Sequence, residues 1–467
     1  MNGILKKFKV GRHDVDMTDG SIAGRLAQFA LPLLLGNLFQ QLYNMVDTWV
    51  IGQSGDNGAY AAVGSVGPII NILIGFFLGL SSGAGVVISQ YYGAKDEKNV
   101  RKAVHTSLAV TLILVVIFTV AGVAMTPLML HLMLDGENSD PAVFTAAEIY
   151  LFIYFAGVAG LMLYNIGSGI LRAVGDSTRP FLFLVVSAVT NTALDLLFVF
   201  VFRMGVAGVA LATVIAQLLS AFLTMFVLLR EKNWVQVRVK ELRIDRAVLS
   251  KILQIGIPAA LQMSITAFSN VFVQSYIGGV ADIDQTVSLG GWTTYSKVDQ
   301  FIFLPLQSLA LAATTFVGQN LGRGDIRRAK KGTWIAYGMA TGVTVLIIAI
   351  VELTAPYLSV FFNHDPAISD AATLLLRVLS PFYLLCCINQ VISAALRGAG
   401  KSIAPMFLMV GSFVVFRQIY LFVVTTYFSN TLIPVGMSYP AGWFLCCVGT
   451  LIYYKCCHFG ESGIVTH

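Results

Sequence analysis

The sequence predicts an all-α integral membrane protein whose twelve transmembrane helices form two six-helix lobes around a central cleft. Of its 467 residues, 57% are hydrophobic and 12% are charged, whereas soluble domains average about 25% charged residues. Apolar stretches long enough to cross a bilayer recur along the chain, and several motifs occur twice at nearly constant spacing. The net charge of +6 does not indicate a nucleic-acid-binding protein, because the basic residues are concentrated between the apolar stretches.

Twelve stretches have the length of about 20 mostly apolar residues that a membrane-spanning helix needs. The predicted spans are residues 25–52, 60–92, 103–130, 142–170, 180–202, 206–229, 247–279, 288–320, 332–356, 368–396, 404–428 and 432–455. Of the 30 Lys and Arg residues, 26 fall in alternate connections between these spans, and the opposite connections contain Arg203 alone. Because basic connections tend to stay in the cytoplasm, both chain ends and the central connection are predicted to be cytoplasmic.

The two halves of the chain are predicted to be duplicates of one six-span unit. The first and seventh spans share Gln28, Pro32, Asn44, Ile51 and Gly52 with Gln254, Pro258, Asn270, Ile277 and Gly278, at an offset of 226. The connections that follow the second and eighth spans share Gln90, Gly93 and Asp96 with Gln319, Gly322 and Asp325, at an offset of 229. The connections before the fifth and eleventh share Leu171, Arg172, Gly175, Ser177 and Pro180 with Leu396, Arg397, Gly400, Ser402 and Pro405, at an offset of 225.

A unit with an even number of spans returns to the side where it started, so the two lobes have the same orientation. An axis along the membrane normal should relate them, as in transporters that rock between inward- and outward-open states. The predicted segments are a cytoplasmic N-terminal part at 1–24, an N-lobe at 25–229, a cytoplasmic linker at 230–246, a C-lobe at 247–455 and a cytoplasmic tail at 456–467.

Two acids, Asp47 and Asp195, lie within apolar spans of the N-lobe. A carboxylate at the centre of a bilayer costs about 2.5–3.5 kcal/mol on insertion scales, so a chain that contains two of them is expected to use them. The repeat supplies an internal control, since Val273 and Tyr420 occupy the corresponding positions of the C-lobe. A structural role shared by both lobes would not predict this asymmetry, whereas a cation site in the N-lobe would.

Four runs of sequence closely resemble the multidrug and toxic compound extrusion family, and the likeness extends over about residues 15–455. They are Gln41–Thr48, Gln90–Asp96, Leu171–Ser177 and Val317–Gly322. The resemblance implies export of drugs or metabolites, driven by inward flow of protons or sodium ions and needing no other cofactor. It also implies a bacterial plasma-membrane protein that works as a monomer on small, amphipathic organic cations.

The same resemblance implies that the cation site of the N-lobe comprises Asp47, Asn191, Asp195 and Thr213. Asn191 and Asp195 are four residues apart and so share a helix face. Two adjacent buried carboxyl groups tend to share a proton, while carboxylate, amide and hydroxyl oxygens also suit Na⁺, and the sequence leaves both ions open. The seventh span contains no acid and the tenth contains Arg377, a pattern nearer to the DinF-like branch than to the NorM-like branch.

Other readings of these residues remain open. Asp47 or Asp195 could form a fixed salt bridge with Arg417 or Arg377, and Thr213 could serve helix packing alone. The candidates for a substrate cleft are polar, aromatic or thioether side chains within the spans: Tyr43, Asn44, Gln262, Met263, Asn270, Lys297, Asp299, Phe301, Arg377 and Arg417. Asn44 and Asn270 recur in both lobes, which also favours hydrogen bonds between helices.

Enzymatic function is not predicted. The run from Gly79 to Gly83 matches the pattern GxSxG, but it lies in an apolar helix and not at the strand-to-helix turn that strains a nucleophilic serine. The sequence has no HExxH motif and no P-loop, so an ion gradient must supply the energy. Two alternatives remain: a flippase for lipid-linked saccharides of the same superfamily, which would use a cationic cleft, and a channel.

Overall fold

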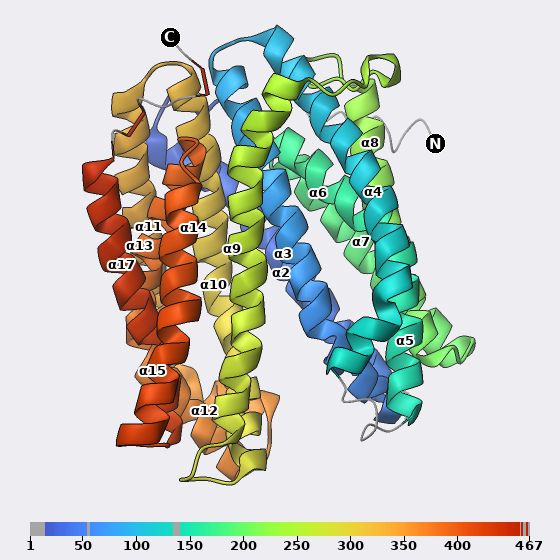
Figure 1. Ribbon diagram of the computed structural model, residues 1–467, viewed down its shortest axis with the longest axis vertical. Coiled ribbons are helices and arrows are strands. Elements are labelled where there is room, and N and C mark those ends of the chain that lie inside the picture. The colour runs from blue at the N-terminus through green and yellow to red at the C-terminus, as the bar shows by residue number, and fades with distance from the viewer. Residues whose placement is uncertain (1–14, 54–56, 134–140, 458, 461–463, 466–467) are drawn as a thin grey trace.

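The computed structural model describes residues 15–53, 57–133, 141–457, 459–460 and 464–465, and the other parts of the two predicted terminal segments lie outside this range. The described residues form helices and connecting loops, and Figure 1 shows two groups of long helices that approach each other at one end, where the described part of the chain begins and ends. The first group contains α2 (Ile22–Gln53), α3 (Asn57–Gly93), α4 (Glu97–Met133), α5 (Pro141–Ala156), α6 (Val158–Ala173), α7 (Thr178–Leu196), the π-helical η1 (Leu197–Val201) and α8 (Gly205–Arg230).

The second group follows the linker helix η2 (Val239–Glu241). It contains α9 (Arg246–Gly278), α10 (Gln285–Gly322), α11 (Ile326–Phe362), α12 (Pro366–Leu379), η3 (Ser380–Phe382), α13 (Tyr383–Gly398), α14 (Ile403–Val410), η4 (Gly411–Phe416), α15 (Arg417–Val423), η5 (Val424–Phe428), α16 (Leu432–Gly436) and α17 (Ser438–Cys456). We call the first group the N-lobe and the second the C-lobe.

The all-helical membrane fold predicted from the sequence is confirmed. Eleven continuous or nearly continuous helices of the described residues are long and apolar enough to cross a membrane, and a bent pair, α5 with α6, brings the number to twelve. The bend of 47° falls at Gly157, where a side chain would overlap Val214 on α8. The glycine therefore permits close contact between helices at the point where the span breaks.

The lobes pack against each other mainly through α3 and α9. A Cβ atom added to Gly79 or Gly83 would overlap the backbone of α9 around Ala260 and Gly256. Ser81, between these glycines, donates a hydrogen bond of 2.7 Å to the carbonyl oxygen of Asn165. Small residues allow such close helix packing in membranes, so the segment that matches GxSxG serves the interface between the lobes.

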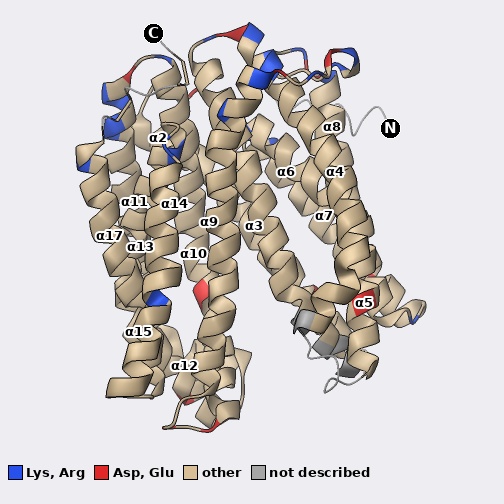
Figure 2. Cartoon of the chain, viewed as in Figure 1, with Lys and Arg blue, Asp and Glu red and all other residues tan. Residues whose placement is uncertain are grey.

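Lys and Arg side chains gather at the end of the molecule where the two groups of helices approach each other, which we call the basic end (Figure 2). Here each lobe touches the other through a glycine: a Cβ on Gly93 would overlap the carbonyl group of Gln319, and a Cβ on Gly322 would overlap that of Gln90. The two contacts are equivalent in the sequence repeat. The lobes are therefore closed against each other at the basic end.

Candidate functional site

Asp47 on α2 and Asp195 on α7 lie side by side within the N-lobe, where their carboxyl groups interact. Asp195 is fully buried and Asp47 is 9% exposed. Nevertheless, both oxygens of Asp195 and Oδ1 of Asp47 lack a hydrogen-bond partner of good geometry. Two acids that are adjacent, buried and poorly satisfied make an unstable arrangement unless a cation joins them.

The other two polar residues of the predicted site lie on α7 and α8. Asn191, one turn before Asp195, is 1% exposed, and neither its amide nitrogen nor its amide oxygen has a partner. Thr213 on α8 donates a hydrogen bond of 3.0 Å to the carbonyl oxygen of Val209 and interacts with the hydroxyl group of Tyr150. The structure thus places the four residues of the predicted cation site in one lobe, on α2, α7 and α8.

The donor set of this site suits a hard monovalent cation or a proton. The unpartnered oxygens belong to two carboxyl groups and one amide. Oxygen ligands of these kinds suit hard cations such as Na⁺ better than they suit soft metal ions. Within the described ranges, no cluster of three or more His, Cys, Asp or Glu side chains could hold a metal ion. A bound Na⁺ would therefore depend on the amide and hydroxyl oxygens as well as on the two acids.

The alternative role for Asp47 and Asp195 is a fixed salt bridge with Arg417 or Arg377, and both arginines lie in the C-lobe. Arg417 is 1% exposed and lies in the C-lobe, where it donates a hydrogen bond of 3.0 Å to Oδ1 of Asn270. Its guanidinium group also lies 4.0 Å from the ring centroid of Tyr439. Arg377 is exposed on α12. Among the ion pairs of the described residues, none involves Asp47 or Asp195.

The C-lobe contains its own intramembrane acid, Asp299 on α10, which is half-buried. The hydroxyl groups of Tyr295 and Tyr383 both donate hydrogen bonds to its Oδ1, the first at 3.3 Å. The two hydroxyl groups are themselves 3.1 Å apart. Unlike the acid pair of the N-lobe, this carboxyl group is held by two tyrosines.

The remaining cleft candidates are dispersed. Lys297 is exposed on α10 and its ammonium group lies 5.8 Å from the ring centroid of Phe362. Asn44 is exposed on α2 and Phe301 is half-buried on α10. Tyr43 lies within electrostatic range of Asp47.

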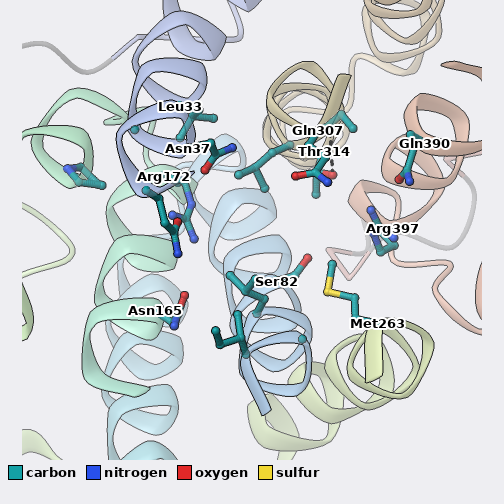
Figure 3. Close-up of a pocket in the computed structure, with 18 of the residues that line it drawn as sticks. Leu33, Asn37, Ser82, Asn165, Arg172, Met263, Gln307, Thr314, Gln390 and Arg397 are labelled. Carbon is teal, nitrogen blue, oxygen red and sulfur yellow. Dashed lines mark hydrogen bonds between the residues drawn. The ribbon is translucent and has the colours of Figure 1, made fainter. Parts of the chain in front are cut away.

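A cavity of about 480 Å³ lies between the lobes, and Gln262 and Met263 of the cleft candidates line it (Figure 3). Sequence reasoning missed the two cationic side chains of its wall, Arg172 and Arg397. The signal was available, since these arginines are equivalent in the repeat, but the charge count assigned both to cytoplasmic connections. Amide side chains also line the cavity: Asn37, Gln40, Asn71, Asn165, Gln307 and Gln390.

The MatE family profile matches this chain twice, at residues 32–197 and 258–423. The two matches begin 226 residues apart, which equals the offset between the first and seventh spans. The chain is 30% identical to the probable multidrug resistance protein YoeA of Bacillus subtilis, over 93% of this chain and 94% of that protein. It is 24% identical to an FAD transporter of Shewanella oneidensis, over 77% of this chain and 78% of that one.

Solved structures show the same fold. An outward-facing multidrug resistance transporter of the MATE family superposes with a TM-score of 0.87 at 22% identity, covering 96% of this chain and 98% of the other. A transporter from Pyrococcus furiosus, described as having a binding pocket of reversed polarity, gives a TM-score of 0.88 at 21% identity, with the same coverage. The chain therefore belongs to the multidrug and toxic compound extrusion (MATE) family, and it is a multi-pass membrane transporter and not an enzyme.

Proposed function

We propose that the protein is a secondary active antiporter that exports amphipathic, drug-like molecules in exchange for H⁺ or Na⁺. The observation that carries the proposal is that α2 and α7 contain both the acid pair and one wall of the central cavity. Asp47 and Asp195 lie on these two helices, and Pro32, Gly36 and Phe181 of the same helices line the cavity. An ion that changes the contact between the acids therefore acts on the substrate-facing wall.

The backbone of α2 offers a way to transmit that change. Pro32 removes one hydrogen bond of the helix ladder, and Gly36 packs against Phe181 and Leu184 of α7, whose nearest side-chain atoms would lie 3.5–3.6 Å from an added Cβ. Asp47 is 15 residues beyond Pro32 on the same helix, or about 22 Å at the helical rise. Ion occupancy of the acid pair would repack α2 on α7 and narrow the N-lobe side of the cavity, which expels substrate.

Several finer assignments belong to this proposal. The basic end faces the cytoplasm of a bacterium, so the closed basic end corresponds to an outward-facing state. The chain works as a monomer and lies nearer to the DinF-like branch, because α9 contains no acid between Ile252 and Tyr276. Organic cations are the substrates that the family resemblance predicts. A flippase for lipid-linked saccharides is the competing function, and the cationic wall of the cavity favours it.

The test is uptake of a fluorescent, amphipathic organic cation by inverted membrane vesicles that contain the protein. A pH gradient and a sodium gradient are imposed separately on the wild type, Asp47→Asn, Asp195→Asn and Glu352→Gln. Glu352 is a matched control, because this acid lies on α11 of the C-lobe, where it accepts a hydrogen bond of 2.6 Å from Ser380. Uptake driven by one gradient, lost in Asp195→Asn and retained in Glu352→Gln, supports the proposal and identifies the ion. If both Asp195→Asn and Asp47→Asn retain gradient-driven uptake, the acid pair is not the coupling site.

A further inference from the structure

The central cavity has a strongly asymmetric charge. Two of its lining side chains are cationic, Arg172 of the N-lobe and Arg397 of the C-lobe, and none of the described lining residues is Asp or Glu. Figure 3 shows the two guanidinium groups on different sides of the space, one reaching from α6 and the other from α13. An organic cation entering this cavity meets positive charge from both lobes.

Arg397 is buried, and the ion pairs among the described residues do not include it. The side chain is 7% exposed, and its Nε has no hydrogen-bond partner. Its guanidinium group donates a long hydrogen bond of 3.5 Å to Oε1 of Gln262, which also lines the cavity. Burying an unpaired charge is costly, and arginine presents several donors in a planar fork that matches carboxylate and phosphate oxygens.

Arg172 supplies the same chemistry from the opposite lobe. It is half-buried, lies in the last turn of α6 and has Tyr164 as its electrostatic neighbour. Because the two arginines are equivalent in the repeat, the pseudo-twofold axis that relates the lobes passes between them. The cavity therefore presents one guanidinium group from each lobe, and the ion pairs of the described residues involve neither.

The rest of the wall suits an amphipathic molecule. Phe181, Met263, Met409 and Phe413 provide aromatic and thioether surface, which adapts to varied apolar shapes. Gln307 and Gln390 add amide groups from the C-lobe. Ligand sites usually combine such a largely apolar wall with a few polar groups that fix orientation.

We infer that the transported substrate carries an oxyanion, such as a carboxylate or sulfonate, and that Arg172 and Arg397 bind this group together. This inference rests on the proposed export function and specifies its substrate class. The preferred substrates are amphipathic anions or zwitterions, and a positive charge elsewhere on the molecule is tolerated. Specificity for the oxyanion and coupling to the ion then reside in separate places, the cavity and the acid pair.

The position of the arginines links substrate binding to closure of the lobes. Arg397 immediately precedes Gly398, whose carbonyl oxygen accepts a hydrogen bond of 2.8 Å from Gln90 of the N-lobe. Arg172 immediately precedes Ala173, whose carbonyl oxygen accepts a hydrogen bond of 2.8 Å from Gln319 of the C-lobe. An oxyanion held by both guanidinium groups joins the lobes just beside the contacts that close the basic end.

The test uses two dyes that differ in one charge: a rhodamine with a free carboxylate and its methyl ester. Binding to the purified full-length protein in zwitterionic detergent is measured by fluorescence anisotropy for the wild type, Arg172→Gln, Arg397→Gln and Arg377→Gln. We expect the acid to bind at least about tenfold more tightly than the ester, because breaking a buried charge pair typically costs that much or more. Arg172→Gln and Arg397→Gln should each remove this preference by weakening binding of the acid.

Arg377→Gln is the matched control, because Arg377 is exposed on α12 outside the cavity and should retain the full preference. Equal binding of both dyes to the wild type, or a loss of binding to both dyes in the arginine variants with normal elution on gel filtration, overturns the inference. Displacement of the acid dye by dispersed phosphatidylglycerol would also overturn it, since a lipid phosphate would then be the occupant. The binding measurement uses no ion gradient. Failure of the oxyanion inference can therefore be distinguished from failure of the antiport proposal.

Discussion

Gln90 and Gln319 are equivalent in the two lobes, and each donates a 2.8 Å hydrogen bond to a backbone carbonyl oxygen of the opposite lobe. Each glutamine also accepts a hydrogen bond through its Oε1, Gln90 from the backbone N–H of Ile464 at 2.8 Å and Gln319 from that of Met17 at 3.3 Å. Both side chains are fully buried. One residue type at two related positions therefore connects the lobes to each other and to both terminal segments of the chain.

Replacing both glutamines should shift the protein away from the state that is closed at the basic end. Each buried hydrogen bond contributes about 0.5–1.5 kcal/mol, so Gln90→Ala with Gln319→Ala should change the ratio of the two states by roughly tenfold or more. Distances between spin labels on the two lobes at the basic end would show a growing population of separated lobes.

Asn389→Ala is the control for that experiment. Asn389 donates a buried hydrogen bond of 2.9 Å to the carbonyl oxygen of Trp443, and both residues belong to the C-lobe. Its loss should lower thermal stability without changing the label distances. An unchanged distance distribution in the double glutamine variant would show that these bonds do not hold the lobes together.

Gly93→Ala and Gly322→Ala should each prevent closure at the basic end by steric overlap. A Cβ at either position would collide with the carbonyl group of a glutamine on the facing helix, and backbone atoms cannot move aside as a flexible side chain can. Transport in vesicles should fall to background while expression and gel-filtration behaviour remain normal. Gly338→Ala should transport normally, because a Cβ there meets nothing within 4 Å; normal transport by Gly93→Ala would contradict the closed-state contact.

The spans could be predicted from sequence because each is long, apolar and flanked by charge, and these features do not depend on tertiary contacts. The limits of helices such as α8 and α9 agree with the predicted spans within a few residues. The break at Gly157 was not predicted, because it reflects the close approach of Val214 from α8. A hydropathy pattern records how apolar a segment is, but it does not record which backbone must come near another.

Asp195→Asn should raise the thermal stability of the protein even as it removes coupling. The wild-type carboxyl group is buried beside Asp47 without good hydrogen bonds, so neutralising one acid should raise the free energy of unfolding by about 1 kcal/mol. Asp299→Asn should have the opposite effect, because its carboxyl group accepts hydrogen bonds from Tyr295 and Tyr383. Thermal unfolding in detergent, followed by tryptophan fluorescence, measures both, and a lower melting temperature for Asp195→Asn would contradict the account.

The linker between the lobes should detach from α4 in acid. The hydrogen bond from Lys102, at 2.8 Å, holds the pKa of Asp245 below its usual value, and the backbone N–H of Val248 adds to the effect. Because the folded pKa is lowered, this stabilisation is fully present above about pH 4, the ordinary value of an aspartate, and is lost as the pH falls through the lowered pKa. Hydrogen exchange of the linker amides, corrected for the intrinsic rate, should show loss of protection below that pH.

Asp245→Asn provides the comparison for the linker. Its side-chain oxygen can still accept from the N–H groups of Ala247 and Val248, which lie 3.1 Å from the wild-type Oδ1, but it cannot pair with Lys102. Its linker should exchange at the acid-state rate at every pH. A wild-type linker that stays protected in acid would show that His105 and Thr106, which also contact the linker, suffice to hold it.

The sequence predicts the residues of one candidate site but not those of the other. Asp47 and Asp195 attract attention because a charge within an apolar span is conspicuous, and the structure places them together, although their role in coupling stays a prediction. Arg172 and Arg397 sit at the ends of spans, where a positive charge is ordinary. Their shared cavity depends on how the two lobes pack, and no local pattern contains that information.

The hydrogen bonds from Met17 to Gln319 and from Ile464 to Gln90 have a practical consequence for experiments on tagged protein. A fluorescent protein or affinity tag fused close to either segment would compete for the space beside these glutamines, and its bulk would favour separation of the lobes. Measurements of conformation or transport on such fusions would then report the fusion as much as the transporter. Fusion partners should be spaced from Met17 and Ile464 by a flexible linker, or moved to the loop between α11 and α12 at the far end of the molecule.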